Sequence, residues 1–168
     1  NTMDVEVKKA VAPAGTYDHF GYRLEQIHVR GSASKPGAAT KTFDWTFPLS
    51  LAYAHCEMAA MIDGTTATMT ATIHADHFFY DDAVSDQPNV AFDIFATADG
   101  GVTPDNIITL DELAAKDITT EARYQVGSLR EPITDLPITN LRQYLMLQTT
   151  TLGHINGEGH CEDVIVQP

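Results

Sequence analysis

The amino-acid sequence predicts a mainly β fold: an antiparallel β-sandwich with a C-terminal helical layer that contains an EF-hand-like helix-loop-helix. Hydrophobic and polar residues alternate over much of the first half of the chain, which is typical of strands. In the second half, leucines and aromatic residues recur at helical spacing. The 168 residues are expected to form a single domain, with about residues 1–80 β-rich and about residues 81–168 mainly helical.

The first predicted strand spans Met3–Val11, where valines alternate with polar residues. A turn at 13–15, with the sequence Pro-Ala-Gly, separates it from a second strand that runs to Arg30. Residues 32–40 are rich in Ser, Gly, Ala and Pro and are expected to form a loop.

The next predicted strand has an aromatic face, because aromatic residues alternate with polar ones at Phe43, Trp45 and Phe47. Two further strand-like runs follow at 51–62 and 66–73. Between them, the Asp63-Gly64 pair is a strong signal for a hairpin turn.

Three helices are expected in the second half of the chain. The first follows Pro88 and contains Val90, Ile94 and Phe95, and the second contains Leu110, Leu113 and Ala114. The third lies within 135–155, where either Thr139 or Asn140 can serve as the N-cap. The threonines at 149–151 are expected to weaken the end of this helix.

Composition excludes two classes of partner. The formal net charge of −13 at pH 7 repels nucleic acid and anionic membrane surfaces and favours cations. No apolar run approaches the roughly 20 residues that span a bilayer. Metal ions are therefore the expected partners.

The chain has two cysteines, Cys56 and Cys161, which form either one disulfide or two unrelated buried thiols. Each is preceded by a histidine and followed by a glutamate, and this symmetry favours the disulfide. The bridge would close a loop of about a hundred residues and stabilise the fold by about 4 kcal/mol in the chain-entropy model. Together with Asn1 at the first position, it leads us to expect an extracellular or periplasmic protein.

A transition-metal site is expected where the disulfide draws histidines together, because neutral imidazole binds copper and zinc. A helical turn would place His74 and His77 on one face, whereas an extended chain would pair His74 with Asp76. The alternative is a hydrogen-bonded structural cluster beside the disulfide. The candidate metal ligands are His55, His74, His77, His154, His160 and Asp76.

The segment 99–113 resembles an EF-hand loop between two short helices, although Asn106 stands where glycine is expected. The alternative is a turn before a helix, in which Thr109 is the N-cap and Glu112 completes a capping box. The candidate calcium ligands are Asp99, Asp105, Ile107 and Glu112.

No nucleophile elbow, phosphate-binding loop or convincing catalytic triad is present in the sequence, so no catalytic residue is predicted and a binding protein is favoured over an enzyme. A structural role is the alternative function. The Met3–Val11 strand would then add to the sheet edge of a neighbouring molecule in an extracellular filament or surface layer.

Three segments resemble those of uncharacterised exported bacterial proteins of the myxobacterial type: 13–17 (PAGTY), 73–81 (IHADHFFYD) and 153–161 (GHINGEGHC). Those proteins also carry an EF-hand-like stretch between the last two segments, and the resemblance covers most of the chain and implies export. More remotely, the PAGTY turn in a β-rich domain is similar to that of MbnP-like periplasmic copper-binding proteins, which implies copper as a ligand.

Overall fold

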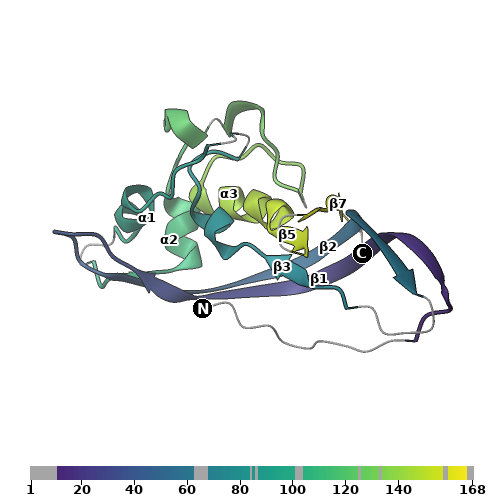
Figure 1. Ribbon diagram of the computed structural model, residues 1–168. Coiled ribbons are helices and arrows are strands. Elements are labelled where there is room, and N and C mark those ends of the chain that lie inside the picture. The colour runs from purple at the N-terminus through teal and green to yellow at the C-terminus, as the bar shows by residue number, and fades with distance from the viewer. Residues whose placement is uncertain are drawn as a thin grey trace.

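The computed structural model describes residues 11–62, 68–83, 85, 87–100, 104–124, 126–132, 134–156 and 159–165. Its largest feature is an antiparallel ribbon of two long strands, β1 (Gly15–Ala33) and β2 (Lys41–Ile62). The helices lie along one side of this ribbon (Figure 1).

Two sheets organise the strands. In the larger sheet, β2 also pairs in parallel with β4 (Ile107–Ile108) and antiparallel with β7 (Glu162–Ile165). The smaller sheet has the order β3 (Ala71–Ile73), β5 (Gly153–Ile155) and β6 (Gly159–His160). The α-helices are α1 (Asp93–Ala98), α2 (Leu110–Ala115) and α3 (Leu141–Gln148). Short 3-10 helices are η1 (Ala75–Phe79), η2 (Ala122–Tyr124), η3 (Val126–Ser128) and η4 (Thr149–Thr151).

The core forms where the aromatic face of β2 meets the helical layer. The strand with this face is observed as predicted, and Trp45 is fully buried with its Nε1 donating a 2.7 Å hydrogen bond to the carbonyl oxygen of Ile108. The residues that pack around it from the helical half include Phe78, Phe95, Leu113, Leu141, Tyr144, Leu145 and Leu152. A mainly β fold with a helical layer is thus observed. Among the described residues, helices rather than a second large sheet cover this face of β2.

A β-bulge changes which residues of β2 face inward. Phe20 pairs with Cys56 and Tyr22 with Tyr53, so two residues of β2, 54 and 55, lie opposite Gly21. A Cβ atom at Gly21 would lie 2.9 Å from the carbonyl oxygen of Tyr53, which requires glycine there. Tyr53 is buried, His55 adopts a φ of 49° and is exposed, and Cys56 is completely buried. The bulge therefore turns Cys56 inward in place of His55.

The predicted disulfide between Cys56 and Cys161 is present. It joins residues 105 positions apart and links β2 to the chain between β6 and β7. Immediately after it, β7 pairs with β2 from Ala54↔Glu162 to Leu51↔Ile165. The C-terminal strands are therefore attached to β2 both covalently and by backbone pairing.

Two helices begin with the side-chain caps that the sequence indicated. The hydroxyl of Thr109 accepts from the backbone N–H of Glu112, whose carboxylate accepts from the backbone N–H of Thr109, and this capping box starts α2. At α3, Asn140 rather than Thr139 is the N-cap, and its Oδ1 accepts a 3.0 Å hydrogen bond from the backbone N–H of Gln143. The threonines that follow α3 continue as the 3-10 turn η4.

Several predicted elements lie outside the described residues. Most of the Met3–Val11 strand belongs to this group, so strand addition through it stays a prediction. The Asp63-Gly64 turn also lies outside them, and only Ala71–Ile73 of the run 66–73 is observed as a strand. Within the described part of the chain, no helix has the length and apolar character needed to cross a bilayer.

Adjacent isoleucines of β4 provide a matched test of the core. Ile108 is 2% exposed and Ile107 is 48% exposed. We expect Ile108→Ala to lower the free energy of unfolding by about 2–5 kcal/mol because it leaves a cavity. Ile107→Ala should cost less than about 1 kcal/mol. Urea unfolding followed by the fluorescence of Trp45, the single tryptophan, measures both values, and equal losses would contradict this core.

Candidate metal centre

The short helix η1 positions two of the predicted ligands, His74 and His77. His74 directly follows β3, and its backbone N–H donates to the carbonyl oxygen of Leu152 at 3.0 Å. The carbonyl oxygen of His74 accepts a 3.2 Å hydrogen bond from the backbone N–H of His77. In a 3-10 turn, residues three positions apart lie above one another, so both imidazoles occupy one side of η1. Phe78 points the other way and stacks on Phe47 of β2 with ring centroids 5.7 Å apart. Of the two local arrangements that the sequence left open, the helical one is observed.

Donor atoms of His74, Asp76 and His77 converge. One nitrogen or oxygen atom from each of the three side chains lies within 4.8 Å of the other two. The two histidines are half-buried and Asp76 is exposed. Two imidazole nitrogens and one carboxylate oxygen form a donor set that divalent transition metals bind.

The surroundings of the Asp76 carboxylate favour its ionised form. Partial burial raises its pKa, but a 2.6 Å hydrogen bond from the Tyr80 hydroxyl and the neighbouring histidines, His77 and His74, lower it. The net effect places the pKa of Asp76 below its usual value. Asp76 is therefore ionised at neutral pH and can coordinate a cation while Tyr80 fixes its orientation.

Hydrogen bonds from α3 and η4 fix the ring and backbone of His77. Its Nδ1 lies 3.2 Å from Oγ1 of Thr151, and that hydroxyl donates to the carbonyl oxygen of Gln148. The hydroxyl proton is thereby used, so we assign Nδ1 of His77 as the donor and place the lone pair on Nε2. The buried Gln148 also donates from Nε2 to the His77 carbonyl oxygen at 2.8 Å.

His154 lies beside this group, on β5. Its ring centroid is 4.4 Å from that of His74 and 5.6 Å from that of His77. Imidazoles bound to one ion at about 2.0–2.1 Å have centroids roughly 5 Å apart. The His154 ring is however tilted by only 34° against His74, and it does not belong to the converging donor group. His154 is thus placed near enough to become a further ligand after rotation of its ring.

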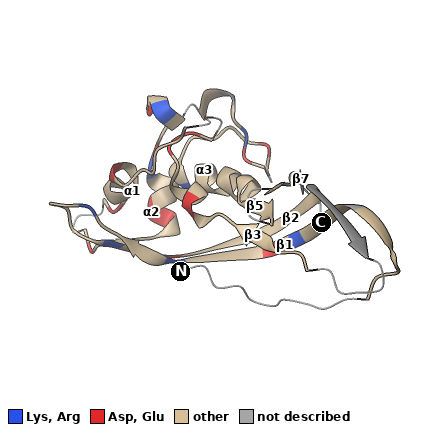
Figure 2. Cartoon of the chain, viewed as in Figure 1, with Lys and Arg blue, Asp and Glu red and all other residues tan. Residues whose placement is uncertain are grey.

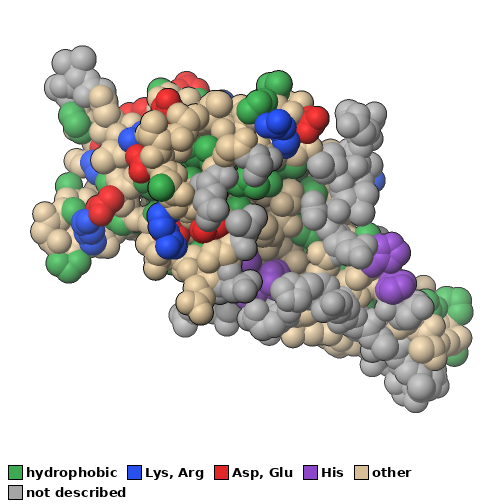
Figure 3. Space-filling view, turned by 90° about the horizontal axis from the view of Figure 1, so that it is seen from above, with side chains coloured by type: hydrophobic (Ala, Val, Ile, Leu, Met, Phe, Trp, Pro, Cys, Tyr) green, Lys and Arg blue, Asp and Glu red, His purple; other side chains and the backbone are tan. Residues whose placement is uncertain are grey.

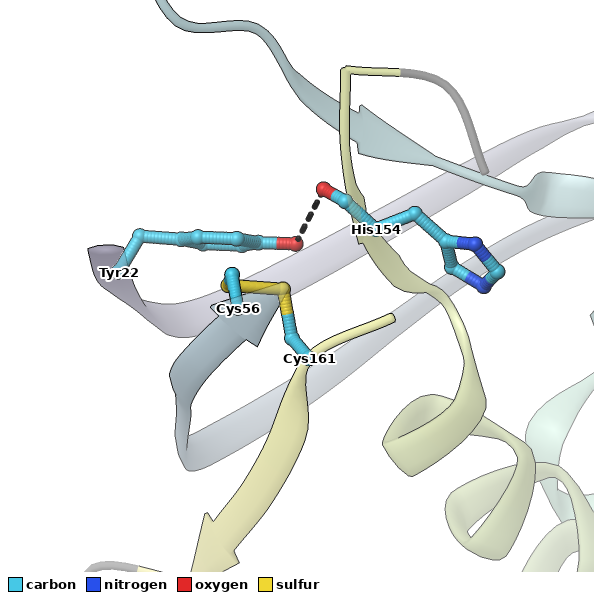
Figure 4. The surroundings of a disulfide bond; sticks show 4 residues. All are labelled: Tyr22, Cys56, His154 and Cys161. Carbon is cyan, nitrogen blue, oxygen red and sulfur yellow. Dashed lines mark hydrogen bonds between the residues drawn. A yellow bond between two sulfur atoms is a disulfide. The ribbon is translucent and has the colours of Figure 1, made fainter. Parts of the chain in front are cut away.

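Gly153 determines how closely β5 approaches the ribbon. A Cβ atom at Gly153 would lie 2.5 Å from the Tyr22 hydroxyl and equally close to the Tyr53 ring. The Tyr22 hydroxyl donates to the His154 carbonyl oxygen at 3.4 Å, and burial raises the pKa of Tyr22 to about 12, so it stays protonated as a donor. Figure 4 shows this hydrogen bond, with the His154 ring extending away from the Cys56–Cys161 disulfide.

The remaining predicted ligands do not join this group among the described side chains. The ring of His55 contacts His19 of β1, with centroids 4.8 Å apart, and both side chains are exposed. The backbone of His160 pairs with that of His154 in the smaller sheet, but the His160 side chain lies outside the described structure. Histidine side chains accordingly occupy two separate places on the face shown in Figure 3.

Three residues at these sites were not predicted from the sequence: Tyr80, Thr151 and His19. Tyr80 lies four residues after Asp76, a spacing that brings side chains together on a helical turn and was available in the sequence. Thr151 and His19 reach their partners only through tertiary contacts with η1 and β2. No local pattern indicates either of them.

The side chain of Lys41, a residue of β2, contacts Asp99 and Asn106 of the predicted calcium loop. Nζ of Lys41 donates to the Asp99 carboxylate at 2.6 Å and to Oδ1 of Asn106 at 3.0 Å. Asp99 is buried, and the hydrogen bond from Lys41 is the chief cause of a pKa below its usual range. Asn106, at the position of the EF-hand glycine, has a φ of 67°, which a residue at that turn needs.

The other candidate calcium ligands have partners within their own loop. Asp105 accepts from the backbone N–H of Ile107 at 2.9 Å, and Glu112 serves the capping box of α2. The alternative to an EF-hand, a turn followed by a capped helix, is therefore confirmed for 109–112. Residues 101–103 lie outside the described part of the chain, and calcium binding stays a prediction.

Comparison with known proteins gives no family for this chain: no family model, no curated protein and no solved structure matches it. The resemblance to exported bacterial proteins stays an expectation. The donor atoms and their geometry are therefore the basis for the function of this site.

Two lysine–aspartate pairs of different burial test the role of Lys41. The side chains of Lys41 and Asp99 are 12% and 1% exposed, whereas those of Lys35 and Asp93 are 44% and 76% exposed. We expect Lys41→Met to lower the urea midpoint clearly, because it leaves a buried carboxylate without its charged partner. Lys35→Met should leave the midpoint nearly unchanged. If both variants unfold at the wild-type midpoint, Lys41 does not stabilise this loop.

Gly153→Ala tests the close approach of β5. The added methyl group would overlap Tyr22 and Tyr53, so we expect a loss of about 1–3 kcal/mol in the free energy of unfolding. Gly127→Ala is the control, since no atom lies within 4 Å of the new methyl group there. Urea unfolding measures both, and a Gly153→Ala variant as stable as the control would contradict the packing described here.

Proposed function

We propose that this chain is an exported metal-binding protein that holds one copper or zinc ion between His74, Asp76 and His77, with His154 as an additional donor. The convergence of three donor atoms within 4.8 Å of one another is the observation that carries the proposal. The contact that holds the His77 ring against Thr151 and the ionised state of Asp76 support it.

The donor set favours a transition metal over calcium. Calcium takes six to eight oxygen ligands, whereas imidazole nitrogens select zinc, copper, iron or nickel. The net charge of −13 raises the local concentration of any cation. Of the acidic residues that Figure 2 colours, most lie on the helices and loops above the ribbon, on the same side of the ribbon as η1.

The exposure of the site supports exchange of the ion. Structural zinc sites are closed by four ligands, but here the three convergent donors come from one short turn and Asp76 is exposed. Water or a ligand from another molecule can complete the coordination. A protein that takes up and releases its metal needs such an open position, so we favour metal acquisition or buffering over a purely structural ion.

Export is proposed from the disulfide. Cys56 and Cys161 are bonded to each other, and no free cysteine is present. Disulfides persist in oxidising compartments and are rare in the cytosol. An extracellular or periplasmic protein encounters copper and zinc from the environment, which agrees with the proposed metals.

Removal of individual histidines tests the proposed centre. We expect His74→Ala and His77→Ala to weaken zinc and copper(II) binding at least about 100-fold, because even residues that only hydrogen-bond to a metal ligand contribute about 10–100-fold to metal affinity. His154→Ala should weaken binding about tenfold, since its ring is adjacent to His74 but outside the converging donor group. Calorimetric titration of the metal-free, disulfide-intact protein measures these affinities. Affinity should also fall as the pH is lowered, because protons compete for the imidazoles.

His28→Ala is the matched control. His28 is an exposed histidine of β1, whose Nε2 lies 2.5 Å from Oδ1 of Asp44, and its removal should not affect this site. Trp45 fluorescence reports whether each variant remains folded. Wild-type protein that binds neither metal, or unchanged affinities after His74→Ala and His77→Ala, would overturn the proposed function.

A further inference from the structure

A second pair of imidazoles lies at the bulge between β1 and β2. His19 and His55 come from neighbouring strands, and their ring centroids are 4.8 Å apart at an interplanar angle of 84°. Two imidazoles bound side by side to one ion, with metal–nitrogen distances of about 2.0–2.1 Å, have centroids about 4.5–5 Å apart. The observed separation falls in this range without movement of either strand.

The backbone holds His55 in an unfavourable conformation that creates this pair. Its φ of 49° lies in the left-handed region, which is unfavourable for a residue with a side chain. The strained residue is part of the bulge opposite Gly21, where His55 is exposed and Cys56 buried. β-Bulges commonly redirect one side chain next to a functional site.

The site is fixed from both sides. The residue after His55 is Cys56, which is buried and bonded to Cys161. The residue after His19 is Phe20, which pairs with Cys56 across the two strands. Pairing between β1 and β2 therefore sets the distance between the backbones of the two histidines before any ion arrives. This fixed backbone lowers the conformational entropy that the two exposed side chains lose when they bind one ion.

We infer that His19 and His55 form a second metal site, separate from the His74 centre, which binds a copper(II) ion at the exposed surface of the ribbon. Copper(II) has the highest affinity among the divalent first-row metals for nitrogen donors, and it accepts two imidazoles with water in its remaining positions. With only two protein ligands, this site is weaker than the proposed centre on η1. The protein then binds two copper ions of different affinity.

The experiment uses copper(II) and the full, disulfide-bonded chain. The His74→Ala/His77→Ala double variant removes the proposed first centre, so copper that remains bound reports the second site. Into this background we would introduce His19→Asn or His55→Asn, because asparagine tolerates the left-handed conformation but has no imidazole. His28→Asn is the control. Calorimetry gives stoichiometry and affinity, and the electron paramagnetic resonance spectrum counts the bound nitrogens.

The double variant should retain one equivalent of copper with two coordinating nitrogens. His19→Asn and His55→Asn should each weaken that binding at least tenfold, and His28→Asn should leave it unchanged. Loss of all copper binding in the double variant, or retention of it after His19→Asn and His55→Asn, would overturn the second site. Either result leaves the test of the first centre intact, since that test uses wild-type protein and the single variants.

Discussion

Burial of the aromatic face of β2 governs how the two halves of the chain pack together. Trp45 and its aromatic neighbours, Phe43 and Phe47, lose almost all contact with water only because the helical half of the chain folds over them. The segment η1 contributes Phe78 to this core, and that contact fixes the side of η1 from which His74 and His77 project. The proposed metal centre is thus oriented by apolar packing on the opposite side of the same short helix.

The C-terminal strands depend on the same ribbon through different contacts. The disulfide attaches them to β2, and Gly153 lets β5 lie directly against Tyr22 and Tyr53. Together these contacts bring His154, some eighty residues later in the chain, next to His74 through the pairing of β3 with β5. A side chain larger than hydrogen at position 153 would move the strand that holds this histidine.

The bulge at 54–55 separates His55 from the histidines of the His74 centre. A regular strand would continue the inward phase of Tyr53 to His55, which would then point toward the core side. The bulge instead buries Cys56 and leaves His55 on the surface beside His19. One extra residue in β2 therefore explains both the buried disulfide and the exposed second pair of imidazoles.

Features that depend on neighbours along the chain could be predicted from the local sequence, in part as a choice between two arrangements. The alternating aromatic strand is one of them. For the capping box at Thr109, the N-cap of α3 and the turn that pairs His74 with His77, the local sequence offered two arrangements each, and one of the two is observed. The disulfide followed from the matching surroundings of two cysteines. Only the tertiary structure decided that His55 leaves the predicted cluster and that Lys41 meets Asp99. Both results depend on strand register and on contacts between distant segments, and a shift of one residue in register reverses the direction of every side chain that follows.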